Sequence, residues 1–267
     1  MRRNPLKLSV CQLPDGLSSG HPAWADLVRH IGHERPDIAL LNEMPFSPWV
    51  AGETSFDEEL AAASVAAHDA ALLSLRVLPT AVISSRPTRG RHKLVNEAFL
   101  LADGEYRCIH HKHYFPQEVG FFEETWFAPE RTGFDVVEYR GIRIGVLLCT
   151  ELLFTEWARH YRRQGAHVIA VPRASGSIMQ HWHAAARMAA IVSGCYVLSS
   201  NRVSDDAGSL PHFGGGGFAY SPTGELLAET SKVMPALCVN IELDLVAHAQ
   251  RHYPCNVREL DAGALDA

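Results

Sequence analysis

The chain lacks the sequence features of three large classes of protein. Its six cysteines include no CxxC pair, which argues against a zinc ribbon and against a disulfide-rich secreted scaffold. It has no run of about 18 consecutive apolar residues, so no helix is expected to span a membrane. Nor does it have a basic excess, because 24 Lys and Arg residues against 30 Asp and Glu residues leave a net charge of −6. This balance argues against a general binder of nucleic acid backbones.

The rest of the composition is that of an ordinary globular domain. Hydrophobic residues make up 47% of the chain and charged residues 20%, and 267 residues are enough to enclose a large core without cross-links. The N-terminus is basic, but Lys7 interrupts the segment that follows, so no signal-peptide core is expected. Together with the unpaired cysteines, this predicts a soluble, reduced, cytoplasmic protein.

Apolar runs bounded by turn residues alternate with amphipathic segments along the chain. We expect strands at residues 6–13, 37–41, 77–84, 94–101, 105–114, 135–139, 143–148, 167–171, 196–201, 218–220, 226–228 and 239–243, and helices at residues 23–35, 56–75, 151–165 and 179–194. Strands that alternate with helices, with no low-complexity linker, indicate one α/β domain. We place this domain at residues 1–250 and a C-terminal tail at residues 251–267.

Three reactive side chains, Glu43, Lys112 and Cys149, follow predicted strands. In α/β sheets, ligands bind at the edge where strands end, so the three side chains are candidates for one site. Cys149 also precedes a predicted helix, whose N-terminus would favour the thiolate and offer N–H groups to an oxyanion. The alternative for any single cysteine is core packing, which we accept for Cys11, Cys195 and Cys238.

The segments around these three residues match a known pattern in the same order. Glu43 lies in LLNEMPF, Lys112 in HKH and Cys149 in GVLLCTE, and further landmarks are Val171-Pro172, Asn201-Arg202 and the Pro-Thr-Gly-Glu segment at 222–225. The ordered set resembles the nitrilase, or carbon–nitrogen hydrolase, superfamily from about residue 6 to residue 243. The resemblance implies a four-layer α-β-β-α sandwich, no metal and no cofactor. It also implies a homodimer or larger homo-oligomer, with the C-terminal tail as an interface arm.

The resemblance also gives each reactive residue a role, and the chemistry of the side chains supports it. Cys149 would attack an amide or carbamoyl carbon, and Glu43 would accept the thiol proton and later protonate the leaving nitrogen. Lys112 would stabilise the oxyanion together with the backbone N–H of Thr150. The GFFEE segment resembles the one that carries the superfamily's second glutamate, which assigns that role to Glu123. Glu123 would orient Lys112 or the substrate nitrogen.

These residues predict a hydrolase of non-peptide C–N bonds that forms a cysteine thioester on a small amide or N-carbamoyl substrate. Within the superfamily the chain is most similar to the N-carbamoyl amine and amino-acid amidases. A nitrilase acting on a nitrile and acyl transfer to an amine are alternatives within the same chemistry. A catalytically idle scaffold of the same fold is the alternative from another class, and the complete Glu–Lys–Cys set argues against it.

Residues that contact the substrate are harder to assign. Arg173 ends a predicted strand, where it could clamp a substrate carboxylate or form an ion pair with Glu151 or Glu156. Aromatic side chains in the loops after Glu43 and Lys112 could wall an apolar pocket or pack in the core. They are Trp49, Phe122 and Trp126.

Two clusters resemble binding motifs but lack the rest of the pattern. His110, His111 and His113 flank Lys112, yet no further metal ligand stands at a recognised spacing. The glycines at 214–217 have no following Lys-Ser/Thr, so we expect tight packing near the pocket rather than a phosphate loop. Gly217 also departs from the family, which commonly has serine there.

Overall fold

The computed structural model of the chain describes residues 6–204 and 211–258. Its first sheet contains β1 (Leu6–Pro14), β2 (Ile38–Leu40), β3 (Ala81–Arg89), β4 (Leu94–Ala102), β5 (Glu105–His111) and β14 (Ala236–Ile241). Its second contains β8 (Val137–Tyr139), β9 (Ile142–Val146), β10 (Val168–Arg173), β11 (Tyr196–Val203), β12 (Phe218–Tyr220) and β13 (Leu226–Glu229). β1, β2 and β3 pair in parallel, as do β9, β10 and β11.

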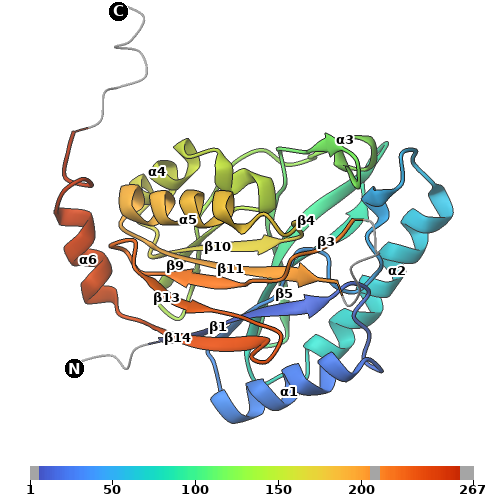
Figure 1. Cartoon of the computed structure of the whole chain (residues 1–267), viewed down its shortest axis with the longest axis horizontal. Helices are drawn as coiled ribbons and strands as arrows, with labels where there is room; N and C mark the ends of the chain where they lie inside the picture. Colours follow the sequence, from blue (N-terminus) through green and yellow to red (C-terminus); the bar gives the residue numbers. More distant parts are fainter. Residues whose placement is uncertain (1–5, 205–210, 259–267) are drawn as a thin grey trace, which may run out of the picture.

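Strand β1 belongs to both sheets. Leu6–Cys11 pair with β14 in antiparallel fashion, whereas Gln12–Pro14 pair in parallel with Asn201–Val203 of β11. The two sheets therefore meet along one strand and fold toward each other, which gives a nearly closed sheet in Figure 1.

Apolar side chains of both sheets form one central core. Leu8 and Ile83 from the first sheet share this cluster with Ile144 and Ala170 from the second. The outer face of the first sheet packs against α1 (Pro22–Glu34) and α2 (Glu58–Leu75). The outer face of the second packs against α4 (Glu156–Arg163) and α5 (Met179–Ser193) (Figure 1). The predicted α-β-β-α sandwich is confirmed.

The alternating pattern located most elements, and local residues set their ends. The side chain of Asp57 caps α2 by accepting hydrogen bonds from the N–H groups of Glu59 and Leu60. Gly194 ends α5 with a φ of 63°, a conformation that glycine adopts at low cost. None of the helices in the described ranges is long and apolar enough to cross a membrane.

Two predicted elements differ most from the structure. The strand expected at 77–84 is β3 at 81–89, because residues 76–80 form a turn that leaves Val77 exposed. The helix expected at 151–165 is two shorter pieces, a 3₁₀ helix η2 (Cys149–Leu153) and α4, separated at Phe154 and Thr155.

The C-terminal segment begins as a helix that packs on the same chain. α6 (Leu243–Arg251) follows β14, and Gln250 donates hydrogen bonds to the carbonyls of Ala166 and Ser193. Cys255 is buried against the end of α5, where it contacts the carbonyl of Ile191. The remainder of the predicted tail, residues 259–267, lies outside the described residues. Its role as an interface arm stays a prediction.

Candidate active site

The predicted acid–lysine cluster is assembled at the edge where strands end. Glu43 follows β2, and Lys112 directly follows β5. The Lys112 Nζ donates hydrogen bonds to Glu43 Oε1 at 2.8 Å and to Glu123 Oε2 at 2.6 Å. All three side chains are fully buried. Glu123 reaches the cluster from α3 (Glu123–Trp126), a single turn inside the long aromatic loop.

Cys149 follows β9 and is also buried, with its Sγ 3.6 Å from the carbonyl oxygen of Ala174. Its φ of 49° places a non-glycine residue in the left-handed region, a strained conformation common at functional sites. Burial raises the pKa of the Cys149 thiol, and the nearby Glu43 carboxylate adds to that shift against the opposing effect of Lys112. Any stabilisation of the thiolate by the N-terminus of the following helix is therefore outweighed by desolvation and the neighbouring carboxylate.

The protonation of the two groups around Cys149 follows from the same balance. Burial raises the pKa of the Glu123 carboxyl to about 8, against the attraction of Lys112 and with added repulsion from Glu43. Burial lowers the pKa of Lys112, but the two glutamates outweigh burial and the net shift is upward. Lys112 is therefore a permanent cation between two carboxyl groups.

Two residues that were given no role in the site from the sequence hold Glu43 in place. The Asn96 Nδ2 on β4 donates to Glu43 Oε1 at 2.7 Å, and the Arg202 Nε donates to the Glu43 backbone carbonyl at 3.0 Å. Both side chains are fully buried. Asn96 could have been identified from the sequence as a candidate site residue, because it is a polar residue inside an apolar strand.

Glu151 connects the segment that carries Lys112 to the segment that carries Cys149. Its Oε1 accepts from the backbone N–H of His113 at 2.7 Å, and its Oε2 accepts from the backbone N–H of Leu148 at 2.7 Å. The His110 Nε2 lies 2.8 Å from the same Oε2. Glu151 is fully buried, so this carboxylate fixes the ends of β5 and β9 relative to each other.

Cys149 opens into a cavity of about 500 Å³, a size typical of small-molecule sites. Thr150 and Glu123 also line it. In η2 the first helical bond runs from the Glu151 N–H to the Leu148 carbonyl, so the Thr150 N–H precedes it and has no partner within the helix. The other lining residues are Pro116, Gln117, Glu118, Phe121, Leu153, Ala174, Ser175, Gly176, Ile178, His181 and Trp182.

The three aromatic residues proposed to contact the substrate do not line this cavity. Trp49 and Trp126 pack in a core cluster, where their indole N–H groups donate to the carbonyls of Gly120 and Glu53. Phe122 is replaced at the cavity by its neighbour Phe121. Position in a loop did not reveal which ring faces inward, since that depends on how the short strands β6 (Gln117–Glu118) and β7 (Phe121–Phe122) pair.

Arg173 is likewise behind the cavity wall rather than on it. Its guanidinium is fully buried and lies over the rings of Trp182 at 4.9 Å and Phe218 at 5.0 Å. It donates to Ser199 Oγ at 3.2 Å, to Ser175 Oγ at 3.0 Å and to the Gly216 carbonyl at 2.7 Å. The alternative ion pair with Glu151 does not form, because that carboxylate is occupied as described above. Arg173 therefore positions Ser175 in the wall.

Among the described residues, one group has the spacing of metal ligands, namely Glu97, Cys108 and His111. Hydrogen bonds explain its geometry. The His111 Nδ1 accepts from the Glu130 N–H at 3.3 Å, so the ring proton is on Nε2, which faces Glu97 at 3.3 Å. A metal at Nε2 would require Nδ1 to donate instead.

The glycine run packs tightly, as predicted. A Cβ on Gly217 would lie 2.7 Å from the carbonyl oxygen of Cys11, and one on Gly214 would lie 2.6 Å from Ser177. Serine therefore does not fit at position 217 without movement of the backbone.

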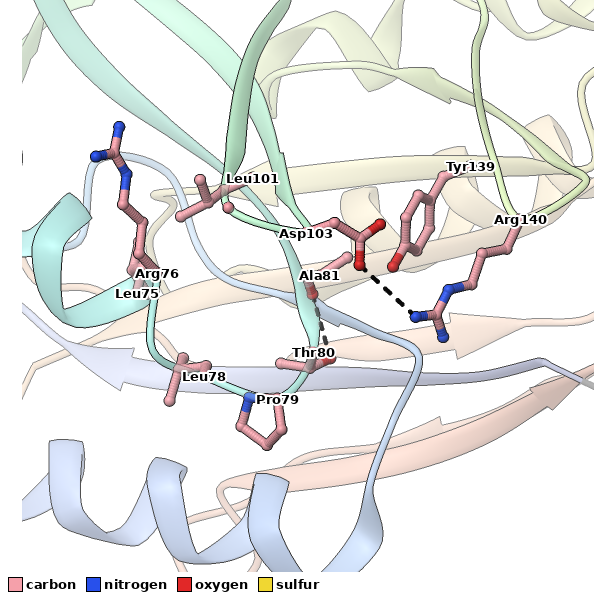
Figure 2. Close-up of a pocket in the computed structure, with 11 residues that line it drawn as sticks. Leu75, Arg76, Leu78, Pro79, Thr80, Ala81, Leu101, Asp103, Tyr139 and Arg140 are labelled. Carbon is pink, nitrogen blue, oxygen red and sulfur yellow. Dashed lines mark hydrogen bonds and ion pairs between the residues drawn. The ribbon is translucent and has the colours of Figure 1, made fainter.

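A second cavity, of about 380 Å³, lies where β3 begins and near the β4–β5 and β8–β9 turns (Figure 2). The Arg140 guanidinium at its rim pairs with Asp37 at 3.1 Å and Asp103 at 3.9 Å. Its lining includes no cysteine and none of the acid–lysine cluster, and it is at the opposite end of the strands from Cys149, so the first cavity is the candidate active site.

The chain is similar to known proteins in both sequence and fold. Residues 7–251 match the family model described as carbon-nitrogen hydrolase. The N-carbamoylputrescine amidase of Arabidopsis thaliana is 31% identical over 164 residues, which cover 56% of this chain and 55% of that protein. The chloroplastic omega-amidase of the same plant is 27% identical over 275 residues, which cover 93% of this chain and 71% of that protein. The chain spans about half the length of several curated relatives that it matches.

The fold is shared with solved structures. The crystal structure of a carbon-nitrogen hydrolase from Helicobacter pylori G27 matches with a TM-score of 0.78 at 22% identity, over 94% of each chain. The arrangement of the sheets and helices is therefore the fold of that structure.

Proposed function

The chain belongs to the carbon-nitrogen hydrolase family, and we propose that it hydrolyses a small amide or N-carbamoyl compound through a thioester on Cys149. The observation that carries this proposal is the buried cluster in which Lys112 bridges Glu43 and Glu123 next to the Cys149 thiol. A protonated thiol needs a neighbouring base, and an oxyanion needs a fixed cation. The cluster supplies both beside the cavity that Cys149 and Glu123 line.

In the proposed reaction, Glu43 accepts the thiol proton as the Cys149 Sγ attacks the carbonyl carbon. Lys112 and the Thr150 N–H stabilise the negative oxygen that forms. The C–N bond then breaks, Glu43 returns its proton to the leaving nitrogen, and ammonia or an amine departs. Water attacks the thioester, Glu43 accepts the water proton, and the acid or carbamic acid is released as Cys149 regains its proton.

A feature of the two glutamates supports an amide or carbamoyl substrate over a nitrile. Glu43 Oε2 and Glu123 Oε1 are buried and have no hydrogen-bond partner among the described residues. Glu43 Oε2 is a buried acceptor without a donor, which is unusual in folded proteins, whereas Glu123 Oε1 carries the proton while that carboxyl is neutral and can donate to the substrate. The –NH₂ group of an amide or carbamoyl substrate offers two N–H donors, whereas a nitrile offers none.

Three ligands of similar length test this function. We expect the wild-type enzyme to release ammonia from pentanamide and from butylurea faster than from pentanenitrile. Cys149→Ala is expected to release none while keeping the wild-type circular dichroism spectrum and melting temperature. Faster release of ammonia from the nitrile would indicate a nitrilase. Full activity of Cys149→Ala would rule out the cysteine mechanism.

Other properties expected from the sequence remain part of the proposal. We propose a homodimer or larger homo-oligomer, which light scattering of the purified chain would detect. A cytoplasmic location, action without a metal or cofactor, and the absence of a nucleic acid or membrane partner are proposed on the same basis.

A further inference from the structure

Arg173 is a buried cation that has no ion pair with an acidic residue in the part of the chain that the structure describes. The hydrogen bonds of its guanidinium go to neutral groups, namely the hydroxyls of Ser175 and Ser199, the carbonyl of Gly216 and the sulfur of Met179. Buried charges in proteins are normally paired, because a buried charge without a counter-charge is costly. None of the reaction steps proposed above uses the charge of Arg173.

The guanidinium lies directly behind the wall of the cavity into which Cys149 opens. Two of the side chains that it contacts, Ser175 and Trp182, line that cavity. Ala174, which separates Arg173 from Ser175 in the chain, lines it too, and the Ala174 carbonyl oxygen is 3.6 Å from the Cys149 Sγ. One short segment therefore holds a positive charge near the sulfur.

This charge acts on the nucleophile rather than on the base. Burial lowers the pKa of Arg173 to about 9, and a thiolate at Cys149 opposes this shift more than Glu229 does. Glu229 is exposed, so solvent screens its charge. The Glu43 carboxylate is directed toward Lys112 and is not among the groups that shift the pKa of Arg173.

Negative charge moves toward Arg173 in the proposed reaction. Below about pH 8 the Glu123 carboxyl is neutral and Glu43 balances Lys112. When Glu43 takes the thiol proton, the negative charge leaves the base and forms on the Cys149 sulfur, and then on the substrate oxygen. A fixed positive charge on the sulfur side favours this transfer, because a protein interior screens charges poorly.

We propose that Arg173 is a positioning residue that acts through its charge, which stabilises negative charge on the Cys149 sulfur from behind the cavity wall. Its side chain does not touch the substrate. The inference deepens the proposed function and rests on Cys149 as the nucleophile.

Alkylation of Cys149 tests the charge without any turnover. Iodoacetamide is neutral and iodoacetate is negatively charged, and the two reagents have nearly the same shape. In Arg173→Gln, which keeps a hydrogen-bond donor and removes the charge, we expect iodoacetamide to react about 10-fold more slowly. The ratio of the iodoacetate to the iodoacetamide rate constant should also fall by about 3- to 10-fold, as measured by peptide mass spectrometry. Arg173→Lys keeps the charge and should keep most of this ratio.

A second variant removes the net charge but leaves Arg173 in place. The Ser199 Oγ is 3.2 Å from the Arg173 Nε, so Ser199→Asp would put a carboxylate against the guanidinium. We expect its reagent ratio to fall as in Arg173→Gln. Arg187→Gln is the matched control, because Arg187 is exposed on α5, the helix that carries Trp182. It loses the same charge at the surface and should keep the wild-type ratio, since solvent screens that charge.

Steady-state kinetics give an independent measure. The kcat for pentanamide should fall by about 10-fold in Arg173→Gln with little change in KM, because Arg173 acts on the reacting groups and not on substrate binding. Arg173→Lys should recover part of kcat. A residue that only packs behind the wall would slow both alkylating reagents equally and leave their ratio unchanged.

The outcomes separate this inference from the proposed function. An unchanged reagent ratio in Arg173→Gln with a wild-type circular dichroism spectrum, or equal losses in Arg173→Gln and Arg173→Lys, would overturn the inference while hydrolysis stands. If the ratio falls in Arg173→Gln and in Ser199→Asp, but the wild-type enzyme releases no ammonia from pentanamide or butylurea, the proposed hydrolysis fails while the effect of the charge on Cys149 stands.

Discussion

At the scale of residues, the raised pKa of the Cys149 thiol means that the proposed nucleophile needs a neighbouring base. Its pKa is raised because the side chain is buried and faces Glu43, so the thiolate forms only as its proton is transferred. Glu43 is suited to accept that proton, because Asn96 and Lys112 both donate to its other oxygen and fix its orientation. In the proposed mechanism, Cys149 and Glu43 therefore act together as nucleophile and base.

Glu43→Gln tests this unit directly. An amide cannot accept the thiol proton, so we expect turnover to fall by about 10²- to 10⁴-fold. We also expect iodoacetamide to alkylate Cys149 more slowly, as measured by peptide mass spectrometry at neutral pH. Glu124→Gln serves as the control that changes an exposed carboxylate. Unchanged alkylation of Cys149 in Glu43→Gln would show that another group takes the proton.

The raised pKa of Glu123 predicts a pH dependence. Below about pH 8 the Glu123 carboxyl is neutral, and above it a second negative charge forms next to Cys149 and Lys112. That charge disfavours the thiolate and competes for the lysine, so kcat/KM should fall as the pH rises through about 8. Glu123→Gln, which stays neutral, should lack this alkaline fall. A fall of the same size in both enzymes would assign it to another group.

At the scale of elements, the site depends on how the ends of β5 and β9 are joined. Glu151 accepts from the backbone on both sides, next to Lys112 and next to Cys149. The two oxygens each accept from a backbone N–H, so the –NH₂ group of a glutamine would face one of these donors in either orientation. The carboxylate therefore matters to position as well as to stability.

Glu151→Gln should lower kcat by about 10²-fold with little change in KM, because the reacting groups shift while binding surfaces remain. The free energy of unfolding should fall by about 2 kcal/mol through the loss of charge-assisted hydrogen bonds. Urea denaturation and steady-state kinetics measure the two effects. Glu151→Asp, which keeps the charge, should recover part of both. Wild-type kinetics in Glu151→Gln would rule out the positioning role.

At position 217, the surrounding backbone leaves no space for a side chain. A Cβ there would meet two backbone carbonyls, those of Cys11 and Ser199, and backbone cannot move aside easily. We expect Gly217→Ala to lower the free energy of unfolding by about 1–3 kcal/mol. Gly32→Ala is the contrasting variant, since Gly32 is exposed in α1 with nothing near its Cβ position. It should raise stability by about 0.5–1 kcal/mol. Equal effects in thermal or urea unfolding would contradict this account.

The sequence predicted those elements well that a single local feature determines, such as an apolar run or a terminal glycine. Apolar runs gave the strands of both sheets, and Gly165 and Gly194 marked helix ends that the structure places at positive φ. The predicted ends of elements were wrong where tertiary contacts determine where an element begins or ends. The segment after Cys149 has a helical composition, yet Glu151 turns back to bind His113 and Leu148, which stabilises a 3₁₀ turn rather than a continuous helix.

At the scale of the whole molecule, the fold decides which predicted site residues meet. Glu43, Lys112, Glu123 and Cys149 come from four separate segments, and the order of the strands brings their ends to one edge. Their burial, and hence the raised pKa of Cys149, follows from two sheets and a loop closing over them, which no local pattern records. The same closure places Trp49 in the core and turns Phe121 toward the cavity.

The six cysteines lie in different surroundings in the folded chain. The cysteines form no disulfide in the part of the chain that the structure describes, and Cys11 and Cys195 are buried core residues whose pKa burial raises to about 12. The Cys149 side chain is also buried, but it lies next to an acid, a lysine and a cavity. Its surroundings, and not its exposure, distinguish it as the proposed nucleophile.

The most direct test of the central claim is intact-protein mass spectrometry of the enzyme quenched in acid during turnover of pentanamide. We expect a species heavier than the free enzyme by one pentanoyl group, mapped by peptide analysis to Cys149 and absent from Cys149→Ala. Turnover of pentanamide with no acyl group on the enzyme, or with the acyl group on another residue, would contradict it.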